Sequence, residues 1–196
     1  MPTNILICGV GGQGIVLTSK LIAATAMAHD IPVKSAETIG MAQKGGSVFS
    51  FLRVGEGAFC PMFAEGTADI IIAFEPAEAV RMLPYLKEGG CTSEAHAVIV
   101  NTHPIMPVTA ALSGSAYTGA EMLEYLEKHV EKLILVDGEK ACAEVGSPRA
   151  LNMIMLGAAV RSGILPFDIN AIEETMKATV KPQFIEMNSK ALHYDE

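Results

Sequence analysis

The chain has 196 residues, half of them hydrophobic and 18% charged, with a formal net charge of −8. This length suits a single α/β domain over residues 1–196 with a substantial core. The acidic balance excludes a nucleic-acid scaffold, because phosphate binding needs a basic face. No apolar run is long enough to span a membrane and no secretory signal is visible, so we expect a cytoplasmic protein that does not contact membranes.

Apolar runs and turn residues predict alternating strands and helices. The N-terminal half contains, in order, a strand over 4–9, a helix over 13–29, strands over 32–36, 47–54 and 68–74, and a helix over 76–86. The C-terminal half contains a strand over 97–101, an irregular segment over 102–118, a helix over 121–128, a strand over 132–137, and helices over 147–162, from residue 168 and after residue 182. This order predicts a three-layer α/β sandwich, in which helices flank a mostly parallel central sheet and the N-terminal half is Rossmann-like.

Side-chain patterns predict how several helices begin and which way they face. Pro76 is expected at the first position of its helix, and Asp168 is expected to cap the helix that the Glu173–Lys177 pair supports. In the helix over 13–29 we expect one apolar face to pack on the sheet, formed by Leu17, Leu21, Ala24 and Ala28.

The mean hydropathy is +0.34. In a chain without a membrane span, so many hydrophobic side chains must be buried elsewhere. A well-filled core would account for it, and so would a large subunit interface, which we favour. We therefore expect the chain to associate, as a homo-oligomer or a hetero-oligomer.

The first glycine loop follows the apolar run over 5–8 and precedes a helix. Its residues are Gly9, Gly11, Gly12, Gln13 and Gly14, with the spacing Gly-x-Gly-x-x-Gly. Glycines permit a tight turn and a close backbone approach, and the helix N-terminus offers free N–H groups to an anion. Three interpretations stay open from the pattern alone: a dinucleotide site, a site for another anion, or a turn that only packs a helix on the sheet.

A second glycine loop follows the next predicted strand, and it contains Glu37, Thr38, Gly40, Gln43, Lys44, Gly45 and Gly46. Because both loops follow strands, we expect them to lie side by side at the sheet edge where open α/β sheets bind ligands. Lys44 adds a cation there, although a solvated surface lysine is the ordinary alternative. Glu37 is placed like the acidic residue that binds a ribose in dinucleotide folds, although a structural role as a cap or a bridge to a partner is slightly favoured.

Metal-binding and cluster-binding patterns are missing from the sequence. The four cysteines, Cys8, Cys60, Cys91 and Cys142, are far apart and form no Cys-x-x-Cys motif. The five histidines show no metal spacing either. We therefore expect no metal site and no iron–sulfur cluster ligated by this chain.

The two loops together resemble the gamma-type domain of 2-oxoacid:ferredoxin oxidoreductases, and the resemblance covers nearly the whole chain. It rests on the segments Gly-Val-Gly-Gly-Gln-Gly over 9–14 and Gly-Met-Ala-Gln-Lys-Gly-Gly-Ser-Val over 40–48. It continues through residues 68–76, 83–86, 106–108, 136–137, 146–152 and 156–158. Within the family, the chain is most similar to the small (beta) subunit of indolepyruvate:ferredoxin oxidoreductase, with the gamma subunits of pyruvate, 2-oxoglutarate and branched-chain oxoacid enzymes as neighbours.

The resemblance implies a division of labour between subunits. Family enzymes decarboxylate a 2-oxoacid oxidatively with thiamine diphosphate, pass electrons through iron–sulfur clusters to ferredoxin, and form an acyl-CoA. This chain has only one Asp-Gly pair, Asp137-Gly138, outside a thiamine diphosphate motif. Thiamine diphosphate, magnesium and the clusters are therefore expected on a large catalytic partner, and this chain is expected to be inactive alone.

For this chain the resemblance implies a ligand-binding or interface role and no catalytic residue. Coenzyme A phosphates or the substrate carboxylate are the candidate anions for the two glycine loops. Arg149, in the first turn of a helix near Asn152, is a candidate partner for a carboxylate, although a surface arginine is the commoner case. Two other functions stay open: an independent dinucleotide-dependent oxidoreductase, and a structural or regulatory partner without a ligand.

Overall fold

The computed structural model describes residues 1–39, 45–88, 96–106 and 116–195. A six-stranded sheet forms its centre, in the order β2-β3-β1-β4-β5-β6. Strands β1, β4, β5 and β6 are parallel, and β3 runs antiparallel between β1 and β2. The strand bounds are Thr3–Val10 (β1), Val33–Ile39 (β2), Ser47–Val54 (β3), Ile70–Ala73 (β4), Ala97–Asn101 (β5) and Leu133–Val136 (β6).

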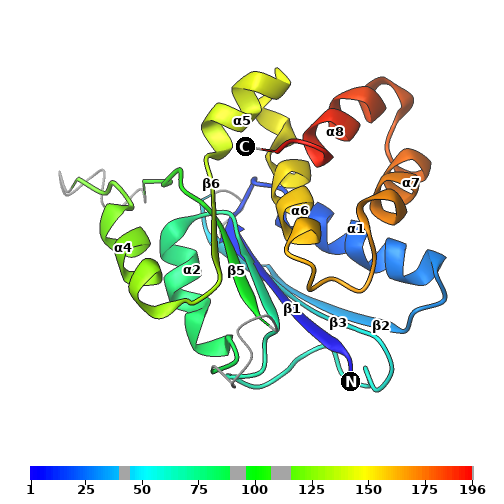
Figure 1. Ribbon diagram of the computed structural model, residues 1–196, viewed down its shortest axis with the longest axis horizontal. Coiled ribbons are helices and arrows are strands. Elements are labelled where there is room, and N and C mark those ends of the chain that lie inside the picture. The colour runs from blue at the N-terminus through cyan, green and yellow to red at the C-terminus, as the bar shows by residue number, and fades with distance from the viewer. Residues whose placement is uncertain (40–44, 89–95, 107–115, 196) are drawn as a thin grey trace.

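Helices cover both faces of this sheet, so the predicted three-layer α/β class is confirmed (Figure 1). Helices α2 (Pro76–Met82) and α4 (Ala120–His129) lie on one side. Helices α1 (Ile15–Ala28), α5 (Gly138–Val145), α6 (Leu151–Arg161), α7 (Ile169–Thr179) and α8 (Ile185–Leu192) lie on the other. Short 3-10 turns are present at Leu83–Tyr85, Pro148–Ala150 and Pro182–Phe184.

Alternating side chains of the central strands pack into two separate hydrophobic cores, one on each face of the sheet. Ile5 and Ile7 of β1 pack in the layer of α1 and α6, whereas Leu6 and Cys8 pack in the layer of α2. Successive side chains of a strand point to opposite faces, and here both faces are covered. This explains why the parallel strands are continuous apolar runs.

The side chains that were predicted to begin two helices do so in the structure. Pro76 occupies the first turn of α2, and the Asp168 carboxylate accepts a hydrogen bond from the Ala171 N–H at the start of α7. The predicted Glu173–Lys177 ion pair is present, with 3.0 Å between Nζ and Oε1. Helix α5 was not expected from the sequence. Its residues alternate between polar and small, and its start is set by the Asp137 carboxylate, which accepts from the Lys140 N–H.

The predicted apolar face of α1 is wrong. Leu17 is 47% exposed, Ala28 is exposed and Ala24 is only half-buried, whereas Ile15, Thr18, Ser19, Ile22 and Ala26 are buried with Leu21. The helix is apolar or small nearly all round, so its sequence does not select one face; packing between the sheet, α6 and α7 does. In the part of the chain that the structure describes, no helix has the length and apolar character to cross a membrane.

Candidate functional site

The two glycine loops meet at one edge of the sheet. The Gly11 N–H donates to the Gly46 carbonyl over 2.9 Å, and Val10 pairs with Ser47 where β1 ends and β3 begins. The expected juxtaposition is thus present for the described part of the second loop, where Gly45 and Gly46 lie. Gly40, Gln43 and Lys44 lie outside the described residues.

Glycine is required at several positions of the first loop. Gly12 and Gly14 have φ of +107° and +93°, a region that side chains disfavour. A Cβ on Gly14 would also lie 3.0 Å from the Asn152 Cβ, and one on Gly9 would lie 2.7 Å from the Phe74 Cβ. Gly11 lacks a positive φ and has ordinary space for a Cβ. A side chain would therefore be strained at Gly12 and Gly14 and crowded at Gly9 and Gly14.

Two amide side chains hold the loop against the ends of the neighbouring strands. Gln13 accepts from the Val10 N–H over 2.7 Å and donates to the Phe74 carbonyl over 2.8 Å. Asn101 donates to the same carbonyl over 3.0 Å and accepts from the Gly138 N–H over 3.1 Å. Gln13 thus joins β1 to β4, and Asn101 joins β4 to the start of α5. Both amides position backbone around the site.

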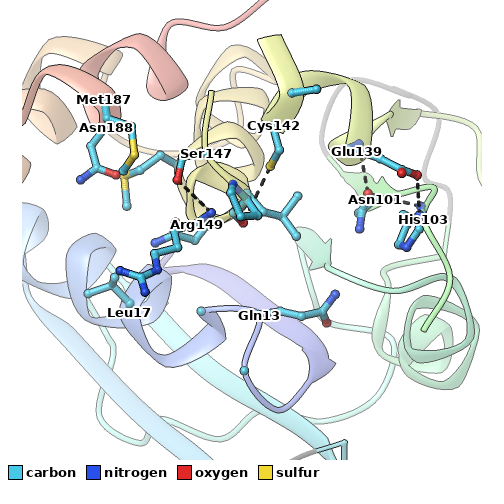
Figure 2. A pocket seen from close by; sticks show the side chains of 18 of the residues that line it. Gln13, Leu17, Asn101, His103, Glu139, Cys142, Ser147, Arg149, Met187 and Asn188 are labelled. Atoms are coloured by element: carbon cyan, nitrogen blue, oxygen red, sulfur yellow. Dashed lines mark hydrogen bonds and ion pairs between the residues drawn. The ribbon is translucent and has the colours of Figure 1, made fainter. Parts of the chain in front are cut away.

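A cleft of about 980 Å³ opens beside this network, at the carboxyl ends of β1, β5 and β6 (Figure 2). Open α/β sheets bind their ligands at this edge. Three helices begin at the cleft: α1 with Gly14, α5 with Gly138, and α6 with the turn that contains Arg149. From the predicted site, the structure brings Gly12, Gln13, Gly14, Arg149 and Asn152 together here.

Helix starts at the cleft favour an anion there, because a helix N-terminus carries a partial positive charge and N–H groups without a partner in the helix. Figure 2 shows the Arg149 side chain reaching from the α6 side toward Leu17 of α1. Arg149 is exposed and forms no ion pair within the described residues. At the other end, His103 Nδ1 lies 3.1 Å from Glu139 Oε2. The end with Arg149 is therefore the one suited to a phosphate or carboxylate.

One wall of the cleft is apolar and comes from the C-terminal segment. It contains Val180, Phe184 and Met187, and Met153 of α6 lies beside it. Cys142 of α5 also lines the cleft, and burial raises the pKa of its thiol. This thiol is therefore neutral at pH 7. The cleft thus combines an end that carries the Arg149 cation with an apolar surface, as small-molecule sites commonly do.

Glu37 and Thr38 do not line the cleft. Both lie on β2, which is the edge strand, and β3 separates β2 from β1. In a dinucleotide-binding sheet the second strand is adjacent to the first. Glu37 therefore lacks the placement of a ribose ligand beside the first loop.

On the α2 face, two buried carboxylates tie the loops to the sheet. Glu75 accepts from the Tyr117 hydroxyl over 2.6 Å, and Glu78 accepts from the Ser47 hydroxyl over 2.6 Å. Burial first, and then the hydrogen bond to Glu75, raise the pKa of Tyr117. This pairing fixes the end of the second glycine loop and the segment before α4 at the β4–α2 junction.

Sequence reasoning missed much of the cleft. Asn101 ends the apolar run of β5, and a single polar residue at that place was a usable signal. Nothing local singled out α5 or the wall that α8 contributes. Across the described ranges, no three histidine, cysteine or acidic side chains converge as a metal site requires.

Replacing Glu173 is expected to loosen the α8 wall in a pH-dependent way. Glu173 of α7 accepts from Ser189 of α8 and pairs with Lys177 and His193, and these contacts, the Ser189 bond first, lower its pKa to about 2. Since the folded pKa lies below the unfolded value of 4.5, the contribution is complete above about pH 5 and disappears as pH falls toward 2.

We expect Glu173→Gln to cost about 1 kcal/mol at pH 6, measured by urea unfolding. The difference from the parent should shrink at pH 3. Glu174→Gln, at an exposed position of the same helix, is the matched control. A penalty for Glu173→Gln that is equal at pH 6 and pH 3 would contradict this role of the ionised carboxylate.

Fold and cleft together define an open α/β domain with a cleft at the carboxyl ends of its parallel strands. Residues 4–194 match the family model described as pyruvate ferredoxin/flavodoxin oxidoreductase. The chain therefore belongs to this family, and the resemblance found in its glycine loops is confirmed.

Similar proteins cover nearly the full chain. The indolepyruvate oxidoreductase subunit IorB of Methanothermobacter thermautotrophicus is 38% identical, covering 97% of this chain and 94% of that protein. The subunit of the same name from Archaeoglobus fulgidus is 37% identical, covering 98% and 92%. A pyruvate/ketoisovalerate oxidoreductase common subunit gamma from Thermococcus litoralis is 28% identical, covering 93% and 89%. The relatives are thus subunits of 2-oxoacid oxidoreductases.

Solved structures show the same fold. Pyruvate oxidoreductase subunit PORC of Thermotoga maritima superposes with a TM-score of 0.69 at 24% identity, covering 98% of this chain and 93% of that one. A 2-oxoglutarate:ferredoxin oxidoreductase of Magnetococcus marinus, solved with 2-oxoglutarate, coenzyme A and succinyl-CoA, gives 0.70 at 20% identity. It covers 97% of this chain and 30% of that longer chain.

Proposed function

We propose that this chain is the small subunit of a 2-oxoacid:ferredoxin oxidoreductase of the indolepyruvate type. The complex would convert an aryl 2-oxoacid to an acyl-CoA by oxidative decarboxylation and pass the electrons to ferredoxin. The observation that carries the proposal is the near full-length similarity, at 34–38% identity, to four proteins that share the name indolepyruvate oxidoreductase subunit IorB.

A large partner subunit would contribute thiamine diphosphate, magnesium and the iron–sulfur clusters. The described cysteines do not fit a cluster, because Cys8 is buried in β1, Cys142 lines the cleft and Cys60 lies in the loop after β3. Thiamine diphosphate would supply the decarboxylation chemistry on that partner. The exposed side chains of Phe59 and Met62, at 91% and 59%, favour association with another subunit over a monomer.

We propose coenzyme A as the ligand of the cleft. The starts of α1 and α6, with Arg149, would hold its phosphates, and the apolar wall would exclude water from the rest. Bound coenzyme A supplies the thiol that accepts the acyl group. Gly40, Gln43 and Lys44 of the second loop are proposed to complete the anion site. The substrate carboxylate is the alternative anion, and it favours the same Arg149 end.

The test is reconstitution of the purified chain with its large partner. The chain alone should show no 2-oxoacid-dependent dye reduction, because thiamine diphosphate and the clusters are proposed to lie on the partner. The mixture should reduce ferredoxin or a dye, with a kcat/KM for indolepyruvate at least tenfold above that for pyruvate or 2-oxoglutarate. Arg149→Ala should raise the KM for coenzyme A several-fold, and Lys140→Ala, on the first turn of α5, is a matched control outside the cleft.

Each alternative has its own outcome in this assay. A preference for pyruvate or 2-oxoglutarate would assign the chain to the gamma subunits and remove the indolepyruvate type. Turnover by the chain alone with a nicotinamide or flavin cofactor would support an independent oxidoreductase. If the partner is fully active without the chain, the subunit role is wrong.

A further inference from the structure

The β4–α2 junction, which here means the end of β4 and the first turn of α2, carries two carboxylates that are almost fully buried. Glu75 is 2% exposed and Glu78 is 6% exposed. The Glu75 carboxylate accepts from the Tyr117 hydroxyl over 2.6 Å and from the Glu78 N–H over 3.1 Å. The Glu78 carboxylate accepts from the Ser47 hydroxyl over 2.6 Å and lies 3.6 Å from the Arg81 guanidinium. Burying a carboxylate is costly unless its oxygens are paired, so these contacts hold the junction in one arrangement.

The same junction also holds the first glycine loop. The Phe74 carbonyl accepts from Gln13 Nε2 over 2.8 Å, and Gln13 Oε1 accepts from the backbone at the end of β1 over 2.7 Å. The two loops are also joined directly, because the Gly11 N–H donates to the Gly46 carbonyl over 2.9 Å. Gly46 precedes Ser47, which bonds to α2. The contacts therefore form a closed ring from the junction to the first loop, to the second loop and back to the junction.

A closed ring of hydrogen bonds makes the two loops depend on each other. Neither loop can leave its place without breaking its bond to the junction or the bond between the loops. Gln13 lines the cleft, whereas Ser47 bonds to α2, which covers the other face of the sheet (Figure 1). Groups that belong to one hydrogen-bond network have non-additive effects when they are replaced. The ring thus gives a physical route from the α2 face to the cleft.

We propose that Glu78 is a positioning residue that acts through Ser47. It holds the two glycine loops as one unit and thereby sets the affinity of the Arg149 end of the cleft for its anion. Glu78 does not line the cleft, so it acts without touching the ligand. The inference rests on the proposed function, which supplies the anion as coenzyme A or the oxoacid carboxylate. It adds that this affinity is controlled from the α2 face.

Kinetics of the reconstituted complex test the positioning role with Ser47→Ala, which removes the hydroxyl that Glu78 accepts from. The KM for coenzyme A should rise about tenfold, as expected for one lost hydrogen bond to a charged group. The kcat should stay within about twofold, because the variant loses binding rather than chemistry. Ser47→Thr keeps the hydroxyl and should restore the parent KM. Ser35→Ala, at an exposed position of β2, is the matched control.

A double-mutant cycle with Gln13→Ala and Ser47→Ala measures whether the loops act as one unit. If the loops were independent, two tenfold effects would multiply to about a hundredfold rise in KM. One unit predicts that the double variant stays near the larger of the two single effects. Amide hydrogen exchange on the full chain without ligand gives a second measure. Ser47→Ala should speed exchange about fivefold over residues 9–14 as well as 45–48, and Ser35→Ala should leave both ranges unchanged.

The outcomes separate this inference from the proposed function. A multiplicative double variant, or faster exchange confined to residues 45–48, would overturn the single unit. A lower urea midpoint with an unchanged KM for coenzyme A would show that the Ser47 bond only stabilises the fold, and this would overturn the positioning role. If the complex is inactive with every oxoacid, the proposed function fails. The exchange result alone then supports or overturns the joint positioning of the loops.

Discussion

Gly157→Ala is expected to destabilise the protein by about 3 kcal/mol and to displace α8 from the cleft. A Cβ at Gly157 in α6 would lie 2.1 Å from the backbone carbonyl oxygen of Leu192, at the end of α8. Arg161 donates to the same carbonyl over 3.3 Å, so that end of α8 is held from two sides. The Leu192 carbonyl belongs to the backbone and cannot rotate away from the added Cβ as a side chain could. The whole of α8 must therefore move away from α6.

Urea unfolding and ligand titration measure the two parts of this effect. The midpoint should fall strongly in Gly157→Ala, and coenzyme A binding should weaken because α8 carries Met187 and Asn188. Gly11→Ala is the control, because the nearest atom to its added Cβ lies at 3.6 Å and its φ is not positive. Alanine is the better helix former by about 1 kcal/mol. An equal or raised stability for Gly157→Ala would therefore show that α8 does not seat on α6.

Gly12→Ala should reduce activity of the reconstituted complex at least tenfold, whereas Gly11→Ala should stay near the parent level. Gly12 has open space around an added Cβ but a φ of +107°. Gly11 has ordinary space and no positive φ. The two variants thus differ in backbone strain rather than in crowding. A side chain at Gly12 costs about 1–3 kcal/mol unless the loop rearranges and turns its N–H groups away from the cleft.

The measurement is kcat and KM for coenzyme A and for the oxoacid in both variants, with unfolding stability beside them. A rise in KM for coenzyme A confined to Gly12→Ala would place the ligand phosphates at this loop. An equal loss in both variants would mean that crowding near Gly46 matters more than φ. Full activity in both would remove the need for close backbone approach at this loop.

Part of the site could be predicted from local sequence because its determinants are local. A Gly-x-Gly-x-x-Gly loop after a buried strand needs positive φ at some of its glycines, and Gly12 and Gly14 have it. Gly11 does not have a positive φ, and spacing alone does not say which glycines of such a loop need one. The meeting of the two loops also followed from the sequence, because strand ends that point the same way share one edge.

The particular placement of residues around that edge was decided by packing. Strand β3 inserts between β1 and β2, and this removes Glu37 from the cleft. Leu17 was expected in the core and instead lines the cleft, because a helix that is apolar nearly all round can bury any face.

By itself the sequence determined the alternation of strands and helices, the buried parallel strands, the caps at Asp168 and Pro76, and the family. These depend on periodicity, turn chemistry and contiguous motifs, which are properties of short segments. Only the tertiary structure decided that α5, α6 and α8 close the cleft and that Asn101, Asn188 and Arg149 surround one volume. The reason is that Arg149 lies 48 positions after Asn101 and 39 positions before Asn188, and each residue looks ordinary in its own segment. Their proximity results from layer packing over the sheet, which no local pattern encodes.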